Sequence, residues 1–195
     1  MTSALDEGVG DACRHLVGQS IRLGTHRLQV RAARAEGHPV TLASSYADLL
    51  NVAPHADCTF RLVTPLFFRR AGKNYALPEP GLVFGSLVAR WNAYGPVRVP
   101  DAVAHALASA SIRYFDIRTV PVTFETRTVG SVGLITYHLA GMEDETKHWA
   151  QALSQFAYFS GVGAKTSMGL GEVAPGDSAE FAASNYRPPG LRDAS

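Results

Sequence analysis

The sequence predicts an α+β fold, with a β-α-β-β-α-β series of elements between residues 58 and 174. Three observations support this prediction. Runs rich in β-branched and aromatic residues alternate with runs that have helical apolar spacing. Proline or glycine separates most of these runs. Hydrophobic residues make up 46% of the 195-residue chain and charged residues 18%, as in ordinary globular proteins.

The first 53 residues predict a helix, a strand and a second short helix, at residues 4–17, 21–32 and 41–50. In the strand, Leu28 and Val30 alternate with Arg27 and Arg31. Successive side chains of a strand point to opposite faces of the sheet. One face of this strand is therefore expected to be apolar and the other cationic.

A more regular pattern begins at residue 58. Its expected elements are, in order, a strand at 58–68, a helix between Pro80 and Gly95, a small extra helix at 101–109, a strand at 112–127, a turn at 129–131, a strand at 132–139, a helix at 146–159 and a short strand ending at 173. Pro65 interrupts the first of these strands, so an edge position or a bulge is expected there.

Apart from the small extra helix, this order is that of a ferredoxin-like fold, which RNA-recognition domains share. Residues 58–174 are therefore predicted to form a ferredoxin-like (RRM-like) lobe. The helix and strand within residues 1–53 match the end of such a lobe, so a partial second ferredoxin-like lobe is expected to precede it. Residues 175–195 have little apolar periodicity, and we expect them to be a flexible tail.

A glycine-rich loop follows the helix at 146–159. Glycines leave room for a ligand to approach the backbone, and lysine and hydroxyl side chains bind phosphate oxygens. The loop residues that could bind such an anion are Gly161, Gly163, Lys165, Thr166, Ser167, Gly169 and Gly171. Neither a Walker A motif nor a dinucleotide-binding fingerprint fits, because Ala164 and Thr166 stand where these motifs require glycine. The loop alone leaves a flexible connection without a ligand equally open.

Four motifs, each weak by itself, occur in a specific order. They are FRLVTPLFF at 60–68, LPEPGLVFGSLVARWNAY at 77–94, SVGLITYHL at 131–139 and the glycine-rich G-x-G-x-K-T-x-x-G-x-G at 161–171. This ordered set resembles the CRISPR-associated repeat-processing endoribonucleases, the sixth Cas family of the RAMP superfamily. The resemblance extends over residues 4–173 and implies that the glycine-rich loop binds RNA.

The resemblance implies two tandem ferredoxin-like lobes that bind a repeat in precursor CRISPR RNA and cut it without a metal or another cofactor. The implied reaction is an in-line attack by a ribose 2′-OH, which leaves a 2′,3′-cyclic phosphate and a 5′-OH. The implied partners are CRISPR repeat RNA, or the mature crRNA, and other Cas subunits of an effector complex. A non-catalytic crRNA-binding subunit of such a complex is the alternative.

Histidine suits the acid and base roles of this reaction because it titrates near neutrality. In the family the catalytic histidine lies near the first helix of the first lobe, and this sequence is expected to lack that part of the lobe. His26, beside the cationic strand face, and His15 are the catalytic candidates that remain. A histidine in a turn or on a helix surface is the alternative for each.

Four arginines are further candidates for RNA contacts. Arg27 and Arg31 would hold phosphates along the first predicted strand, although a solvated charged face explains them equally well. Arg118 and Arg127 lie on the long predicted strand at 112–127. The resemblance implies that basic residues of this strand contact RNA.

Charge, cysteines and apolar runs restrict the remaining classes of protein. The chain carries 18 Lys+Arg and 17 Asp+Glu, so its net charge of +1 does not by itself indicate a nucleic-acid binder. Cys13 and Cys58 have no ligand partner at metal spacing, so no metal site is expected. The N-terminus lacks a signal-peptide pattern and the apolar runs are too short for a membrane span. We therefore expect a cytoplasmic protein without a membrane partner.

Overall fold

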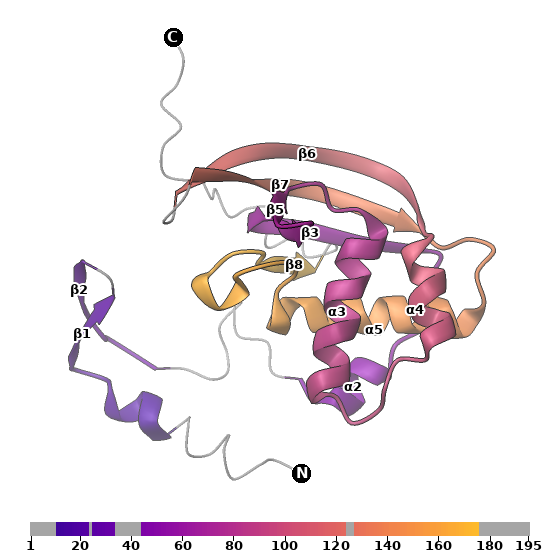
Figure 1. Ribbon diagram of the computed structural model, residues 1–195. Helices are drawn as coiled ribbons and strands as arrows, with labels where there is room; N and C mark the ends of the chain where they lie inside the picture. Colours follow the sequence, from indigo (N-terminus) through magenta and orange to yellow (C-terminus); the bar gives the residue numbers. More distant parts are fainter. Residues whose placement is uncertain (1–10, 24, 34–43, 124–126, 176–195) are drawn as a thin grey trace. The chain divides into compact units, whose positions relative to one another are not determined.

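The computed structural model describes residues 11–23, 25–33, 44–123 and 127–175 (Figure 1). The chain divides into two compact units, Met1–Ser44 and Ser45–Ser195, and each is described by itself. Within the described parts of both units, the helices are too short or too polar to cross a membrane. The predicted tail lies outside the described residues from residue 176 onward.

The smaller unit contains a helical turn and a hairpin. Residues 11–15 are helical, and the part of the predicted helix before residue 11 lies outside the described residues. The hairpin consists of β1 (Ser20–Leu23) and β2 (His26–Gln29), which pair in antiparallel fashion. The prediction of one strand over 21–32 was wrong, because Leu23 pairs with His26 and the chain therefore forms two antiparallel strands within this range.

The larger unit contains a four-stranded antiparallel sheet in the strand order β6-β7-β3-β8. The strands are β3 (Asp57–Leu66), β6 (Ser111–Thr123), β7 (Arg127–His138) and β8 (Val173–Pro175). The helices α2 (Tyr46–Leu50), α3 (Pro80–Tyr94), α4 (Asp101–Ala108) and α5 (Asp144–Ser160) gather on one side of this sheet (Figure 1). The predicted α+β class is confirmed as a mixture of helices and antiparallel strands.

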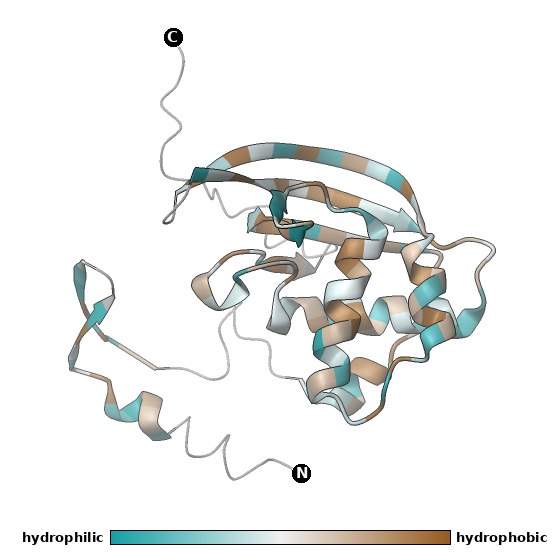
Figure 2. Ribbon diagram, in the orientation of Figure 1, coloured by the Kyte–Doolittle hydropathy of each residue, from teal (hydrophilic) through white to brown (hydrophobic). Residues whose placement is uncertain are grey.

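Alternation of side chains explains how β3 joins the sheet to the helices. Cys58, Phe60 and Leu62 are buried, while the residues between them are half-buried. The pairing of β3 with β7 shifts register between Leu62 and Leu66. The bulge expected at Pro65 is therefore present, since proline cannot donate a ladder hydrogen bond. Hydrophobic and hydrophilic residues also alternate along the edge strand β6 (Figure 2).

The turn predicted at 129–131 was wrong, because β7 runs through these residues without interruption. Thr123 pairs with Arg127, so the chain reverses between those two residues. Gly130 instead lets β7 pack closely against β3. A Cβ atom at Gly130 would lie 2.8 Å from the Cβ atom of Pro65, closer than real side chains approach.

The helices enclose an aromatic core. Val83, Leu87 and Trp91 stand four residues apart on α3 and are all buried, as their helical spacing requires. The Trp91 ring meets the rings of Trp149 and Phe156 edge-on, at centroid distances of 5.6 Å and 5.2 Å. Such edge-to-face pairs stabilise a core beyond the area that they bury.

Candidate functional site

The glycine-rich loop connects the end of α5 to β8, as predicted. It contains a short 3-10 helix, η1 (Thr166–Met168). The loop begins at Gly161, which caps α5 with a φ of 65° and donates its amide to the Ala157 carbonyl at 2.8 Å. A positive φ at a helix end is a conformation that glycine adopts without a steric penalty.

Backbone hydrogen bonds hold the base of the loop against the sheet. The Ala164 amide donates to the Phe67 carbonyl at 2.8 Å, and the Gly171 amide donates to the Pro65 carbonyl at 3.1 Å. The Val162 amide donates to the Gly171 carbonyl at 2.8 Å and closes the loop upon itself. These amides already have acceptors within the protein, so they are not available to a phosphate.

Three of the loop glycines are required by packing within the protein. A Cβ atom at Gly163 would lie 2.5 Å from the Phe67 carbonyl oxygen and 2.7 Å from Leu66 Cδ1. Cβ atoms at Gly161 and Gly171 would overlap other atoms of the loop itself. These glycines were predicted to leave room for a ligand, but protein atoms occupy that space.

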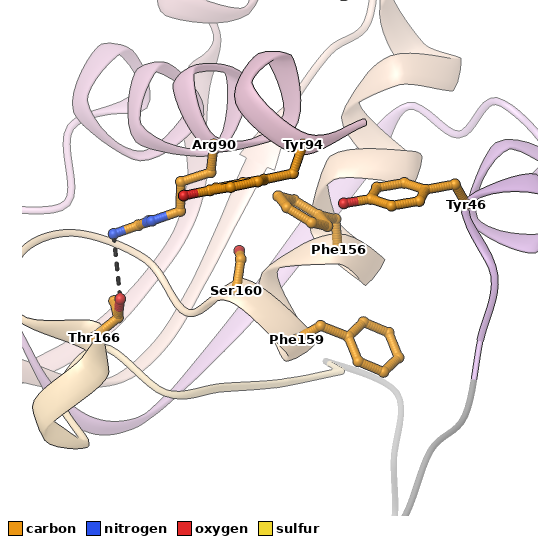
Figure 3. A pocket seen from close by; sticks show the side chains of 7 residues that line it. All are labelled: Tyr46, Arg90, Tyr94, Phe156, Phe159, Ser160 and Thr166. Carbon is orange, nitrogen blue, oxygen red and sulfur yellow. Dashed lines mark hydrogen bonds between the residues drawn. The ribbon is translucent and has the colours of Figure 1, made fainter. Parts of the chain in front are cut away.

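Arg90 on α3 holds the loop from the other side. Its guanidinium donates from Nη1 to the Gly161 carbonyl at 3.1 Å and from Nη2 to the Gly163 carbonyl at 2.5 Å. Nη2 also lies 3.5 Å from Thr166 Oγ1 (Figure 3). Partial burial lowers the pKa of Arg90 from its ordinary value. Arg90 was not among the predicted site residues, although it is the only charged residue of α3.

The apex of the loop, residues 165–169, is the part that faces solvent. Lys165, Ser167, Met168 and Gly169 are exposed, and Lys165 adopts a left-handed conformation with a φ of 60°. A Cβ atom at Gly169 would meet no atom within 4 Å, in contrast to the glycines at the base. The apex therefore presents the Lys165 ammonium and the Ser167 hydroxyl on a base that the rest of the fold holds in place. Cations and hydroxyls of this kind bind phosphate oxygens.

Among the other predicted contacts, His15, His26, Arg27 and Arg31 belong to the smaller unit, and all four are exposed. His26 begins β2 and pairs with Leu23. In the next register position Arg27 lies directly opposite Arg22, so the hairpin carries two arginines side by side. Arg27 and Arg31 were predicted to lie on one strand, but Arg31 follows the end of β2.

Arg118 and Arg127 lie on the β6–β7 pair of the larger unit, and both are exposed. Arg118 pairs with Val132, and Arg127 begins β7 opposite Thr123. Tyr114 lies on the same strand as Arg118 and is 50% exposed, so its ring is accessible. The sheet thus places one cation near its middle and another at the hairpin end.

A charged cluster and a short hairpin were not predicted. The Asp57 carboxylate accepts from His138 Nδ1 at 2.7 Å and from Arg113 Nη1 at 2.8 Å, which joins β3, β7 and β6. The hydrogen bond from His138 lowers the pKa of Asp57.

The short hairpin consists of β4 (Phe68–Arg70) and β5 (Lys73–Tyr75), whose turn at 71–72 has two positive φ values. Among the described residues, no group of three or more His, Cys, Asp or Glu side chains is placed to hold a metal ion.

Comparison with known proteins identifies the family. Residues 60–173, which extend from within β3 to the first residue of β8 and include the whole glycine-rich loop, match the family model of the CRISPR-associated endoribonuclease Cas6. The chain belongs to the Cas6 family. The resemblance expected from the four motifs is thereby confirmed.

Individual Cas6 relatives show how far the similarity extends. A CRISPR-associated endoribonuclease Cas6 of Mycobacterium tuberculosis is 30% identical over 161 residues, which cover 80% of this chain and 50% of that protein. The chain therefore spans about half the length of the curated relatives it matches. A Cas6 protein solved as a product complex is 40% identical, with a TM-score of 0.83 over 89% of this chain and 73% of that one. Thermus thermophilus Cas6 is 30% identical, with a TM-score of 0.70 over 76% of this chain and 65% of that one.

Proposed function

We propose that this Cas6 chain binds precursor CRISPR RNA at its repeats and processes it as an endoribonuclease. The observation that carries the proposal is the Cas6 family match across the unit that presents the loop apex. One solved Cas6 relative, 40% identical to this chain, was captured both as a product complex and as a substrate-mimic complex. The exposed Lys165 ammonium and Ser167 hydroxyl are suited to phosphate groups of such an RNA.

The proposed reaction is a metal-independent phosphoryl transfer within the RNA. The ribose 2′-oxygen forms a bond to the neighbouring phosphorus while the bond to the 5′-oxygen breaks, which gives a 2′,3′-cyclic phosphate and a 5′-OH. A base accepts the proton of the 2′-OH, an acid protonates the leaving 5′-oxygen, and cations stabilise the phosphorane. We assign the base role to His26, with His15 as the second candidate, and phosphate binding to Arg27 and Arg31.

We also infer that residues 58–174 form a ferredoxin-like lobe, preceded within residues 1–53 by part of a second. Two features support the assignment of the first lobe. From β3 to β8 the main elements follow in the order β-α-β-β-α-β, and the sheet order β6-β7-β3-β8 places the first and third strands at its centre. In this lobe, the RNA contacts that we propose are the loop apex, Arg118 and Arg127.

The test is cleavage of an end-labelled cognate repeat RNA by the full chain in EDTA. We expect one discrete product with a cyclic phosphate, because the attacking group is supplied by the RNA itself. A repeat with a single 2′-deoxy nucleotide at the cut position is the matched control, and it should bind without being cut. Tight binding of the unmodified repeat without cleavage would contradict the endoribonuclease and leave a crRNA-binding subunit. A His26→Ala variant that cleaves at the full rate would remove His26 from the base role.

A further inference from the structure

A cavity of about 410 Å³ opens beside the glycine-rich loop, within the larger unit (Figure 3). Its lining comes from four aromatic residues, together with Arg90, Ser160 and Thr166. The aromatic residues are Tyr46, Tyr94, Phe156 and Phe159. Its volume falls within the range of about 300–1,000 Å³ that small-molecule sites occupy.

Packed aromatic rings form the inner wall of the cavity. Phe156 is buried at 6% exposure and packs against Trp91 at a centroid distance of 5.2 Å. Tyr46 packs against the same Trp91 ring at 5.2 Å. Tyr46 begins α2, whose capping box of Ser45 and Asp48 fixes the start of the helix. Rings held in this way lose little conformational entropy when a ligand binds.

The mouth of the cavity exposes two further rings. Tyr94, the last residue of α3, is 77% exposed, and Phe159, near the end of α5, is 44% exposed. The two rings flank the opening from different helices (Figure 3). Tyr158 braces Phe159 edge-on at 5.1 Å. Exposed aromatic rings at a concave site can stack on the face of a flat ligand, and such stacking contributes affinity without hydrogen bonds.

The cavity is continuous with the loop apex through Thr166. The Thr166 side chain lines the cavity, while its neighbours Lys165 and Ser167 face solvent. The guanidinium of Arg90 also lines the cavity, but it donates to the Gly161 and Gly163 carbonyls. The cavity thus offers aromatic surface, and the adjoining apex offers the phosphate-binding groups. A nucleotide has two matching parts next to each other, a flat base with a face that can stack and an anionic phosphate.

We propose that this cavity receives an unpaired nucleobase of the bound RNA, stacked against Tyr94 and Phe159 while the adjoining phosphate lies at the loop apex. The inference rests on the proposed RNA-binding function and specifies which part of the RNA the helical side of the larger unit recognises. The site selects a flipped or single-stranded nucleotide over a paired one, because a base within a duplex cannot enter a cavity. Base identity matters little, since every base presents a stacking face.

The first experiment locates the base. Repeat RNAs with 2-aminopurine at successive unpaired positions are titrated with the full chain, and the fluorescence of each RNA is recorded. Stacking on the aromatic rings should quench the fluorescence at one position, and the Tyr94→Ala variant should lose that quenching. The Ile112→Ala variant is the control, because Ile112 is 45% exposed on β6 and does not line the cavity. Quenching that is the same in both variants would overturn the inference.

The second experiment measures the coupling between ring and base. Tyr94→Ala and Phe159→Ala should each weaken binding by roughly 5- to 100-fold, and Tyr94→Phe should bind like the wild type. An abasic nucleotide at the located position should weaken wild-type binding to a similar extent and have little further effect on Tyr94→Ala. If the abasic nucleotide weakened the binding of Tyr94→Ala as much as it weakens that of the wild type, the inference would be overturned.

Two outcomes separate this inference from the proposed function. If repeat RNA binds and Lys165→Ala weakens that binding, while Tyr94→Ala and Phe159→Ala do not, the cavity has another occupant, such as a protein segment. In that case the inference fails and the proposed function stands. If the full chain does not bind repeat RNA at all, both fail.

Discussion

The contrast between two loop glycines tests whether the loop is built as a fixed base with an open apex. Gly163 and Gly169 have nearly the same φ, 81° and 80°. Their surroundings differ, because a Cβ atom would lie 2.5 Å from the Phe67 carbonyl oxygen at Gly163 and would meet no atom within 4 Å at Gly169. Alanine at either position therefore has the same backbone penalty, but only alanine at 163 has a steric one.

The expected magnitudes follow from these two contributions. A left-handed conformation costs an alanine about 1–2 kcal/mol relative to glycine, so Gly169→Ala should lower the free energy of unfolding by about that amount. Overpacking against a backbone carbonyl adds about 1–3 kcal/mol, so Gly163→Ala should lower it by about 2–5 kcal/mol. The reduced entropy of the unfolded chain is common to both variants and cancels in the comparison.

Urea unfolding followed by tryptophan fluorescence is the suitable assay. The chain has 2 tryptophans, Trp91 and Trp149, and both lie in the core of the larger unit, so their fluorescence reports on that unit. Equal destabilisation by Gly163→Ala and Gly169→Ala would refute the assignment of Gly163 to internal packing. If Gly169→Ala lowered the free energy of unfolding more than Gly163→Ala does, the open space around Gly169 would be refuted as well.

Three further predictions concern the core and the sheet. Burial raises the pKa of the Cys58 thiol to about 12, whereas Cys13 is exposed. Ellman's reagent should therefore modify Cys13 rapidly and Cys58 only when the protein unfolds. Rapid modification of both thiols in the folded protein would contradict the fold. Asp57→Asn should lower the free energy of unfolding at neutral pH, because the pKa of Asp57 is lowered in the folded protein and the ionised carboxylate therefore stabilises the fold. The difference from the wild type should shrink as the pH falls below about 4, where Asp57 becomes protonated. A difference that grows in acid would contradict the hydrogen bond from His138. Tyr137→Phe should lower the free energy of unfolding by about 1–3 kcal/mol in a urea titration, because it leaves a buried backbone carbonyl without its donor; no loss would contradict that contact.

Elements with strong local signals could be predicted from the sequence. The periodic apolar residues of α3 and α5 and the alternating residues of β3 predicted those elements because burial of a periodic face determines them. The chain reversal predicted at 129–131 was misplaced for the opposite reason. Gly130 has the composition of a turn, but its role is a close contact with Pro65 from another strand, and that contact is not visible in the local sequence.

The candidate site was predicted only in part. The loop and its lysine were found because glycine spacing is a local feature. Arg90 was missed because its hydrogen-bond partners lie 71 to 76 residues further along the chain. The aromatic cavity was missed for a similar reason, since Tyr46, Tyr94 and Phe159 come from three different helices. A sequence also does not show whether a glycine makes room for a ligand or for the protein itself.

The salt dependence of repeat-RNA binding tests the role of the loop apex most directly. The affinity of the full chain for a labelled repeat is measured from low to high salt for the wild type, Lys165→Ala and Lys147→Ala. Lys147 lies on α5, and its replacement is the control because it also removes one positive charge. Each phosphate contact on a single strand contributes roughly 0.7 to the slope of log affinity against log salt. Lys165→Ala should weaken binding and reduce the slope by about that amount, while Lys147→Ala should leave it unchanged. An unchanged affinity and slope for Lys165→Ala would contradict the assignment of RNA binding to the glycine-rich loop.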